Sequence, residues 1–214
     1  MAEDCYFGMY ARFETTSKKD AAILLGSDCI VGEYLEVQFR PHEGLTRAWL
    51  ANPYGSDIGY LDQVTSNRLN VLAVRGWTLK AMLAFVAYTD EPEPGHYWGQ
   101  VALICYAPNY DEAFLSFADT VSKMLGRGIR PRIDLSTQAV HSVIESKGTW
   151  EPSDRSPLPE KNKHTVILKK QCSFMDGMVQ QGRAGNKGCY AISWVFLLAM
   201  VAAILFGLKS CGVF

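Results

Sequence analysis

Residues 77–106 read WTLKAMLAFVAYTDEPEPGHYWGQVALICY, and they carry the clearest fold signal in the chain. From 77 to 89, apolar side chains occupy both alternating positions, which is typical of a strand covered on both faces. The run EPEPG at 91–95 supplies turn formers, and its prolines keep the loop from adding to a sheet. A second apolar strand follows at 97–106. The stretch therefore predicts a long hairpin in a barrel or in a sheet covered on both sides.

Shorter elements are expected on the N-terminal side of this hairpin. Alternation of apolar with polar or small residues predicts strands at 7–13, 29–39, 46–51 and 58–61. Pro41 should end the second strand, and the turn formers NPYGSD separate the last two. A short helical turn is expected at 20–25. Asp62 can cap a further helix that runs to about Val74.

On the C-terminal side of the hairpin, apolar residues at helical spacing predict two helices that pack on the sheet, at 111–125 and 136–147. Three prolines and many polar residues then indicate a linker from 151. We expect a fold of the α+β class: a small β-barrel with packed helices, a linker and one C-terminal transmembrane helix. The expected domains are a globular head at 1–150 with two added helices, a flexible basic linker at 151–189, a transmembrane helix at 190–208 and a short tail at 209–214.

The apolar run YAISWVFLLAMVAAILFGL at 190–208 predicts the membrane span. It carries no charge, and as a helix it would reach about 28 Å, close to the roughly 30 Å of a bilayer core. The first residues resemble no export signal, and basic residues are more frequent before the run than after it. We therefore expect a tail-anchored, single-pass protein of the plasma membrane with a cytoplasmic head; in a eukaryote, an internal membrane would suit the same tail.

Charge is distributed unevenly along the chain, although the net charge is only −1. Residues 1–150 hold 13 Lys and Arg against 18 Asp and Glu, whereas residues 160–188 hold six against two. An acidic head is a poor general binder of phosphate backbones. The basic residues before the span can contact anionic lipid headgroups or act as an ordinary positive-inside flank. The candidate headgroup contacts are Lys169, Lys170, Arg183 and Lys187.

No pattern in the chain predicts catalysis or metal binding. The six cysteines form no CxxC pair, and no two histidines are spaced to bind one metal from a helix. No Gly-x-Ser-x-Gly turn presents a nucleophile. We expect no enzymatic activity, no metal, no cofactor and no disulfide framework. Arg127, Arg130 and Arg132 form a basic cluster that either meets an anionic partner or is solvated and paired within the head.

Three short motifs carry a resemblance to a known family. They are IVG at 30–32, IGYL at 58–61 and VAL at 101–103, and with them residues 30–106 resemble the HIRAN domain. The resemblance implies a small β-barrel, and its DNA-binding members capture the 3′ end of a single strand. Their hallmark run NPxDxNAI follows the second strand, where this chain reads RPHEGLTRAWL at 40–50. The resemblance therefore implies the fold, and DNA-end binding is kept as an alternative.

Arginines and aromatic residues of the expected barrel are the candidate ligand-binding residues: Arg40, Arg47, Trp49 and Tyr60. Aromatic rings stack on bases or on peptide prolines, and the same rings are also common in cores. The favoured hypothesis is a non-enzymatic adaptor or binding module that holds a protein partner at the membrane. The alternative is a membrane-tethered protein that binds the 3′ end of single-stranded nucleic acid.

Overall fold

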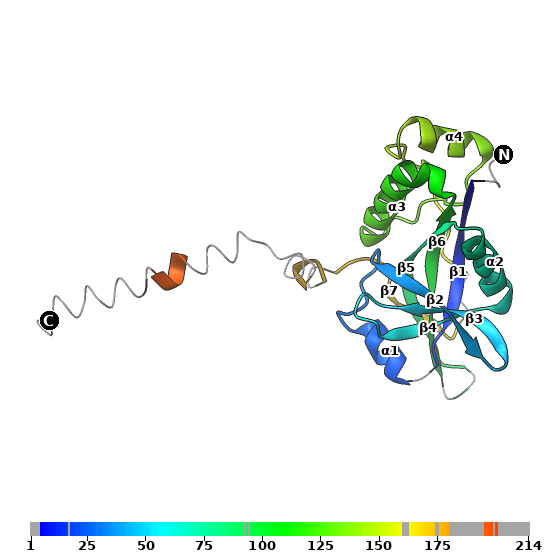
Figure 1. Cartoon of the computed structure of the whole chain (residues 1–214). Helices are drawn as coiled ribbons and strands as arrows, with labels where there is room; N and C mark the ends of the chain where they lie inside the picture. Colours follow the sequence, from blue (N-terminus) through cyan, green and yellow to red (C-terminus); the bar gives the residue numbers. More distant parts are fainter. Residues whose placement is uncertain are drawn as a thin grey trace, which may run out of the picture. The chain divides into compact units, whose positions relative to one another are not determined.

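The computed structural model describes residues 5–16, 18–91, 93, 95–159, 163–173, 176–179, 195–198 and 200 of the 214. The chain divides into two compact units, Met1–Cys172 and Ser173–Phe214. Figure 1 labels the helices and strands, and all of the labelled ones belong to the first unit.

A closed six-stranded β-barrel forms the centre of the first unit (Figure 1). The strands are β1 (Tyr6–Glu14), β2 (Tyr34–His42), β3 (Leu45–Ala51), β4 (Asp57–Leu61), β5 (Thr78–Thr89) and β6 (His96–Tyr106). They follow one another in the order β2-β3-β4-β1-β6-β5, and all pairs are antiparallel. A short pairing of β2 with β5, from Tyr34 opposite Met82, closes the ring. The structure thus confirms an α+β head built on a barrel.

The long hairpin of β5 and β6 contributes the two longest strands of this barrel, as its apolar pattern predicts. The two strands pair from Thr78 opposite Tyr106 to Thr89 opposite His96, and seven successive residues of β5 (81–87) and six of β6 (101–106) are buried. One set of side chains fills the barrel interior with residues such as Phe13 and Leu83. The other set faces outward against helices, which explains why neither face is polar.

Four α-helices surround the barrel, namely α1 (Lys18–Leu25), α2 (Gln63–Val74), α3 (Asp111–Gly126) and α4 (Thr137–Glu145), and a 3-10 turn (Pro108–Tyr110) precedes α3. Helices α3 and α4 cover the outer face of β5 and β6 through buried residues that include Phe114 and Phe117. In Figure 1 they lie at one end of the barrel and α2 lies beside β1. Asp62 caps α2 by accepting a hydrogen bond from the Thr65 amide at 3.0 Å, as expected from the sequence.

Strand β2 differs from the expectation at both ends. It begins at Tyr34, because the preceding residues form turns, and it continues through Pro41 to His42. The two-residue loop Glu43–Gly44 has positive φ angles of 52° and 77°, which is the hairpin turn whose twist matches that of the strands. In the antiparallel register, Pro41 lies opposite Thr46, next to the turn-closing pair His42 and Leu45. Pro41 therefore occupies a position where no ladder hydrogen bond is needed.

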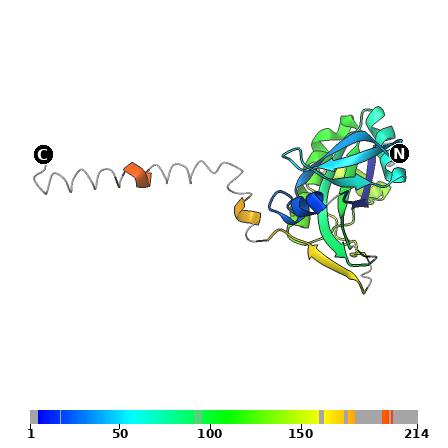
Figure 2. The ribbon, with the colours of Figure 1, turned by 90° about the horizontal axis from the view of Figure 1, so that it is seen from below.

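A seventh strand lies within the segment expected to be a flexible linker. β7 (Thr165–Lys169) pairs with β5 from Val86 opposite Lys169 to Thr89 opposite Thr165, and Figure 2 shows it in yellow along the margin of the sheet. Residues further upstream also contact the head, because the Arg132 amide donates to the Asp154 carbonyl at 2.9 Å. The first unit therefore extends to Cys172, not to residue 150.

The expected transmembrane helix at 190–208 lies outside the described residues, apart from 195–198 and 200, which are helical. Among the residues that the structure describes, no helix is long and apolar enough to cross a membrane. The rest of the expected linker, at 180–189, also lies outside the described part of the chain.

Candidate functional site

Strands β2, β3 and β4 bring the four predicted ligand-binding residues together on the outer face of the barrel. Arg40 lies opposite Arg47, and Trp49 lies opposite Tyr60. Their strand neighbours Ala48 and Leu50 point into the core and are fully buried, so the alternation of the strands sends the four residues outward. A register shift of one residue would reverse this arrangement.

The aromatic rings on this face form one continuous cluster. The ring centroids of Trp49 and Tyr60 are 5.4 Å apart, and the ring of His42 lies 4.6 Å from Tyr60 and 5.3 Å from Trp49. Each arginine lies over one of the larger rings: Arg40 is 4.7 Å from the Trp49 centroid, and Arg47 is 4.9 Å from that of Tyr60. We call the five residues the arginine–aromatic face. Such contacts attract a guanidinium group to the face of an aromatic ring.

The two arginines differ in their partners. Arg40 makes a two-pronged ion pair with Asp57, with nitrogen–oxygen distances of 2.5 and 3.1 Å, and this pair fixes its guanidinium. Within the described part of the chain, Arg47 has no carboxylate partner and no hydrogen bond. The face therefore carries one uncompensated positive charge beside an ordered pair.

Several N–H groups beneath this surface lack acceptors. The Nε atoms of Arg40 and Arg47 and the Nε1 of Trp49 are shielded from solvent and have no partner among the described residues. A buried donor without an acceptor costs free energy, typically about 1–3 kcal/mol. A ligand that shifts the arginines off the rings and supplies oxygen atoms would relieve this cost. The face is thus suited to hold an anionic or carbonyl-rich group.

Helix α2 supports the face from below. The Ser66 hydroxyl accepts a hydrogen bond from the Ala48 amide at 3.0 Å, and the Gln63 side chain donates to the Thr46 carbonyl at 3.1 Å. Both contacts tie β3 to the first turns of α2. Sequence reasoning did not include His42 or Asp57 in the site. The alternation of β2, which places His42 two residues beyond Arg40, was the signal available for the histidine.

One of the candidate lipid-headgroup residues, Lys169, makes contacts within the head. The Lys169 ammonium donates to the Gly26 carbonyl at 2.6 Å and to the Cys29 carbonyl at 3.0 Å, so it holds the end of α1 against β7. Lys170, its neighbour, is exposed. Arg183 and Lys187 lie outside the described residues.

The basic cluster of the loop after α3 does not form one surface. Arg132 pairs with Asp134 at 3.0 Å, and Arg127 is exposed. Arg130 is partly enclosed: its guanidinium lies 3.5 Å from the Tyr10 ring centroid and donates to the Gln100 side chain. Burial lowers the pKa of Arg130. The three cations therefore have separate surroundings and do not converge on a common ligand.

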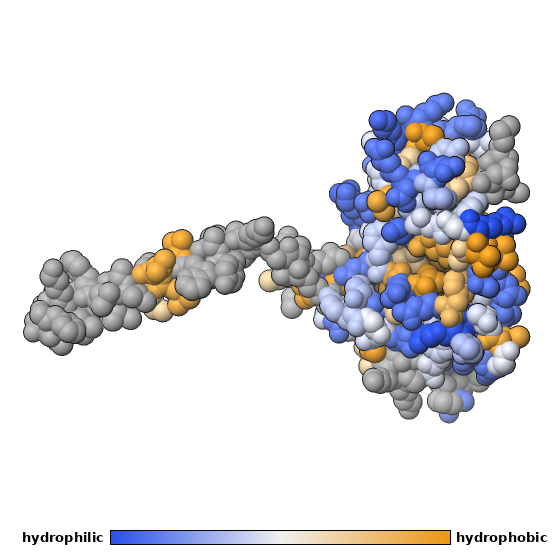
Figure 3. Space-filling model, in the orientation of Figure 1, coloured by the Kyte–Doolittle hydropathy of each residue, from blue (hydrophilic) through white to orange (hydrophobic). Residues whose placement is uncertain are grey.

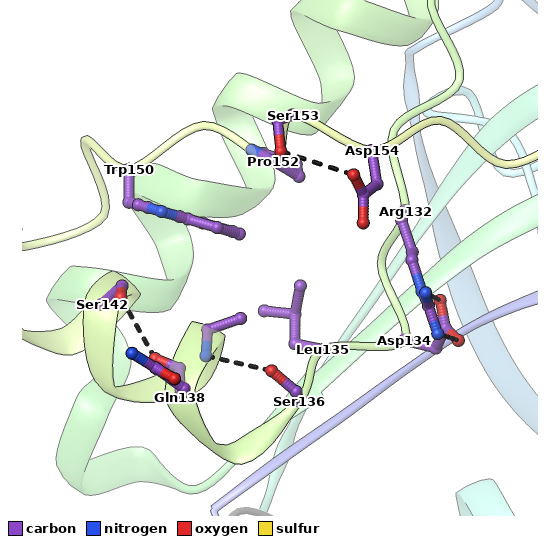
Figure 4. Close-up of a pocket in the computed structure, with 11 residues that line it drawn as sticks. Arg132, Asp134, Leu135, Ser136, Gln138, Ser142, Trp150, Pro152, Ser153 and Asp154 are labelled. Carbon is purple, nitrogen blue, oxygen red and sulfur yellow. Dashed lines mark hydrogen bonds and ion pairs between the residues drawn. The ribbon is translucent and has the colours of Figure 1, made fainter.

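A pocket of about 340 Å³ lies beside α4 (Figure 4). The ring of Trp150 forms one wall, and Leu135 lies across from it. The polar groups shown there bond to one another: the Ser136 hydroxyl caps α4 by accepting from the Ala139 amide at 3.3 Å. No histidine or cysteine lines this pocket. Seven of its eleven lining residues are polar or charged, and one of its serines, Ser153, donates a hydrogen bond to Asp154 at 3.5 Å.

Within the part of the chain that the structure describes, no group of three or more histidine, cysteine or acidic residues is placed to hold a metal ion. Comparison of the chain with protein-family models, with curated proteins and with solved structures finds no match.

Proposed function

We propose that the chain is a non-enzymatic binding module, whose arginine–aromatic face holds an acidic or carbonyl-rich segment of a protein partner. The observation that carries the proposal is the arrangement of Arg47, a cation without an ion-pair partner among the described residues, over the Tyr60 ring and beside Trp49. Tryptophan, tyrosine and arginine are the residues that most often dominate the energy of protein interfaces. Binding of a carboxylate would give Arg47 the partner that it lacks.

The proposal places this module at a membrane as a tail-anchored, single-pass protein of the plasma membrane with its head in the cytoplasm. It rests on the uncharged run at 190–208 and on the excess of basic residues before it. In support, residues 195–198 are helical and their apolar side chains are 51–65% exposed. Lys169, Lys170, Arg183 and Lys187 are the proposed contacts of anionic headgroups, and Lys169 is the one whose ammonium also donates to two carbonyls of the head.

We also propose that the head is HIRAN-like. The six-stranded barrel in which α2 joins β4 to β5 supports this proposal, because residues 30–106 carry the three motifs of the resemblance. Of these, IVG lies in the turn before β2, IGYL lies in β4 and VAL lies in β6.

Binding of single-stranded nucleic acid is the second candidate function. It is favoured by the three contacting rings of His42, Trp49 and Tyr60, which could form a stacking platform for bases. Charge favours the protein partner instead, because Asp57 already neutralises Arg40 and, among the described residues of this face, Arg47 alone is left to meet phosphates. Nucleic-acid binders normally use clusters of cations.

One experiment separates the two candidates. A photo-crosslinking amino acid is introduced at Leu45, which is exposed and lies opposite His42 of the face, or, as a control, at the exposed Glu145 of α4, and full-length chains are irradiated in cells. The proposal expects a discrete protein adduct from position 45 that is lost when Arg47→Gln or Trp49→Ala is added and that never forms from position 145. Without such an adduct, the partner hypothesis fails.

The nucleic-acid candidate is tested on the purified full-length chain in detergent, by fluorescence anisotropy of labelled single-stranded DNA. Oligonucleotides with free and blocked 3′ ends are compared at two salt concentrations. Binding that needs a free end, weakens steeply with salt and is reduced by Arg47→Gln but not by Arg127→Gln would favour the second candidate. Arg127 is a suitable control because it is exposed and lies at the end of α3.

Membrane anchoring is tested separately by truncation after Cys189. The full-length chain should stay with the membrane fraction after alkaline extraction, and the truncated chain should be released. If both are released, the apolar run does not anchor the protein.

A further inference from the structure

Strand β1 has a free edge in an otherwise closed barrel. On one side it pairs with β6 over its whole length, from Tyr6 to Glu14. On the other side its recorded pairing with β4 covers only Phe13 and Glu14. The seven residues 6–12 therefore have no strand partner on that side within the described part of the chain.

The direction of the backbone groups follows from the register. The Ala107 amide donates to the Cys5 carbonyl at 3.0 Å, so the odd-numbered residues of β1 direct their N–H and C=O groups toward β6. The even-numbered residues direct theirs to the opposite side. Glu14 uses this side to pair with Tyr60 of β4. Gly8 and Tyr10 have no strand there, and no backbone hydrogen bond of theirs on this side is found among the described residues.

A cleft of about 500 Å³ opens along this edge. Its lining comes from the start of β1, from one side of α2 and from the loop before α4, and it comprises Tyr6, Phe7, Gly8, Arg68, Val71, Leu72, Arg75, Asp134 and Leu135. Figure 1 shows α2 lying beside β1, and residues of both elements line the cleft. Figure 3 shows apolar surface in this region next to strongly hydrophilic side chains.

The charged groups of the cleft favour an acidic ligand. Arg68 lies in α2 and Arg75 directly follows the helix as its C-cap, and neither makes an ion pair with any described residue. The guanidinium carbon of Arg68 lies 3.9 Å from the centroid of the Phe7 ring, and both residues line the cleft. Asp134, the one acidic residue of the lining, is already paired with Arg132 through two hydrogen bonds of 3.0 and 3.1 Å. The cleft therefore presents two positive charges without compensation.

We propose that this cleft is a second interaction site, which takes an extended acidic segment of a protein partner as an added strand on β1. The backbone of the segment would pair with Gly8 and Tyr10, as in other cases where a peptide extends a sheet edge. Arg68 and Arg75 are seven residues apart, which is about 10 Å along a helix. Side chains on one face of a strand recur about every 6.6 Å, so long arginine side chains can reach acidic residues at alternate positions.

The proposal is independent of the arginine–aromatic face. None of the five residues of that face lines the cleft, and the cleft lies between β1 and α2, not on β2 and β3. An acidic extended segment is favoured over a compact anion because the edge offers donors and acceptors in line, and only a backbone can use both.

The experiment uses the full-length chain in detergent and a fluorescein-labelled peptide, acetyl-EVEVEVEV-amide. Two versions of the peptide carry N-methyl groups at alternate residues, one at the odd positions and the other at the even positions. In a strand pairing, only one set of amides faces β1. One version should therefore lose at least tenfold in affinity, whereas the other should bind as the unmodified peptide does. A KVKVKVKV peptide should bind at least tenfold more weakly than the acidic one.

Variants locate the peptide on the protein. Arg75→Gln should weaken binding several-fold, and Arg127→Gln, a change of equal charge on exposed surface elsewhere, should not. A photo-crosslinker at Val71, which lines the cleft, should capture the peptide, and one at Val64 of the same helix, which does not, should fail to.

Three results would overturn the proposal. Equal binding of both N-methylated peptides would show attraction by charge alone, without strand addition. No binding of the acidic peptide at millimolar concentration would show that the edge of β1 does not bind an acidic extended segment. Self-association of the chain that blocks crosslinking from Val71 would assign the edge to a second copy of the chain instead.

Discussion

Replacing Lys169 by methionine tests whether the seventh strand is part of the head. Methionine keeps the length of the side chain and removes the ammonium, which bridges the Gly26 and Cys29 carbonyls at 2.6 and 3.0 Å. Gly26 directly follows α1, where the unsatisfied carbonyls of a helix end carry partial negative charge. The variant therefore loses two charge-assisted hydrogen bonds and leaves their acceptors behind.

The size of the effect can be bounded from the structure. A hydrogen bond to a charged group contributes about 1.5–3 kcal/mol. Lys169 is only half-buried, so water can replace part of the loss, and we expect about 1–2 kcal/mol in total. For a unit of 172 residues, each kcal/mol lowers Tm by about 2–4 °C, so the variant should melt about 3–6 °C lower. Lys170→Met is the matched control, because Lys170 is exposed, and it should melt within about 1 °C of the parent chain.

The assay is thermal unfolding of the full-length chain by circular dichroism, with hydrogen exchange as a local readout. Exchange should rise at 26–29 and along β7 in the Lys169 variant only. If the two variants melted alike and exchange at 26–29 did not change, the ammonium would not hold α1. Lys169 would then be as available to lipid headgroups as the basic flank pattern alone suggests.

Two further predictions concern the cores. Phe117→Ala should lower the free energy of unfolding by about 3–5 kcal/mol in urea titration, because its fully buried ring lies between Tyr6 and Trp150, at centroid distances of 6.2 and 6.3 Å. Leu115→Ala, on the same helix and 37% exposed, should cost less than about 1.5 kcal/mol, and equal losses would contradict the packing described. Burial raises the pKa of Cys105 to about 12, so above pH 9 the unfolded chain releases this proton first, and stability should fall between pH 9 and 12. Cys105→Ala should reduce the slope of this part of the pH–stability curve. An unchanged slope would show that the Cys105 thiol does not cause the fall in stability.

The elements that local pattern could predict are those whose partners are neighbours in the chain. The strands β3, β4, β5 and β6 were expected within one or two residues of their observed ends, because each is joined by a turn to its pairing partner. The site residues were candidates because of their residue types, and the hairpins that carry them follow from the same local pattern. Arg40 and Arg47 belong to one hairpin, and Trp49 and Tyr60 belong to the next, so their outward positions follow from alternation.

The elements that the sequence did not reveal depend on distant contacts. β7 has only five residues, and its outward side chains Val166 and Leu168 are apolar, so its pattern lacks the polar face of an ordinary half-exposed strand. It is a strand because β5, about 80 residues earlier, presents an edge with which it can pair. Pairing between strands that are distant in the chain has little effect on the local sequence pattern.

The amino-acid sequence by itself determined the class of the head and the order of its strands and helices, because hydrophobic periodicity and turn residues act over short distances. It also named the two arginines and two rings as candidates by their residue types. Only the tertiary structure decided that the barrel closes by pairing of β2 with β5 and that β1 keeps a free edge beside α2. It also decided that the His42 ring contacts Trp49 and Tyr60. Asp57 forms an ion pair with Arg40 and not with Arg47 for the same reason. Each of these contacts depends on which distant segments of the chain pack together, and that packing is determined by the close-packed core as a whole.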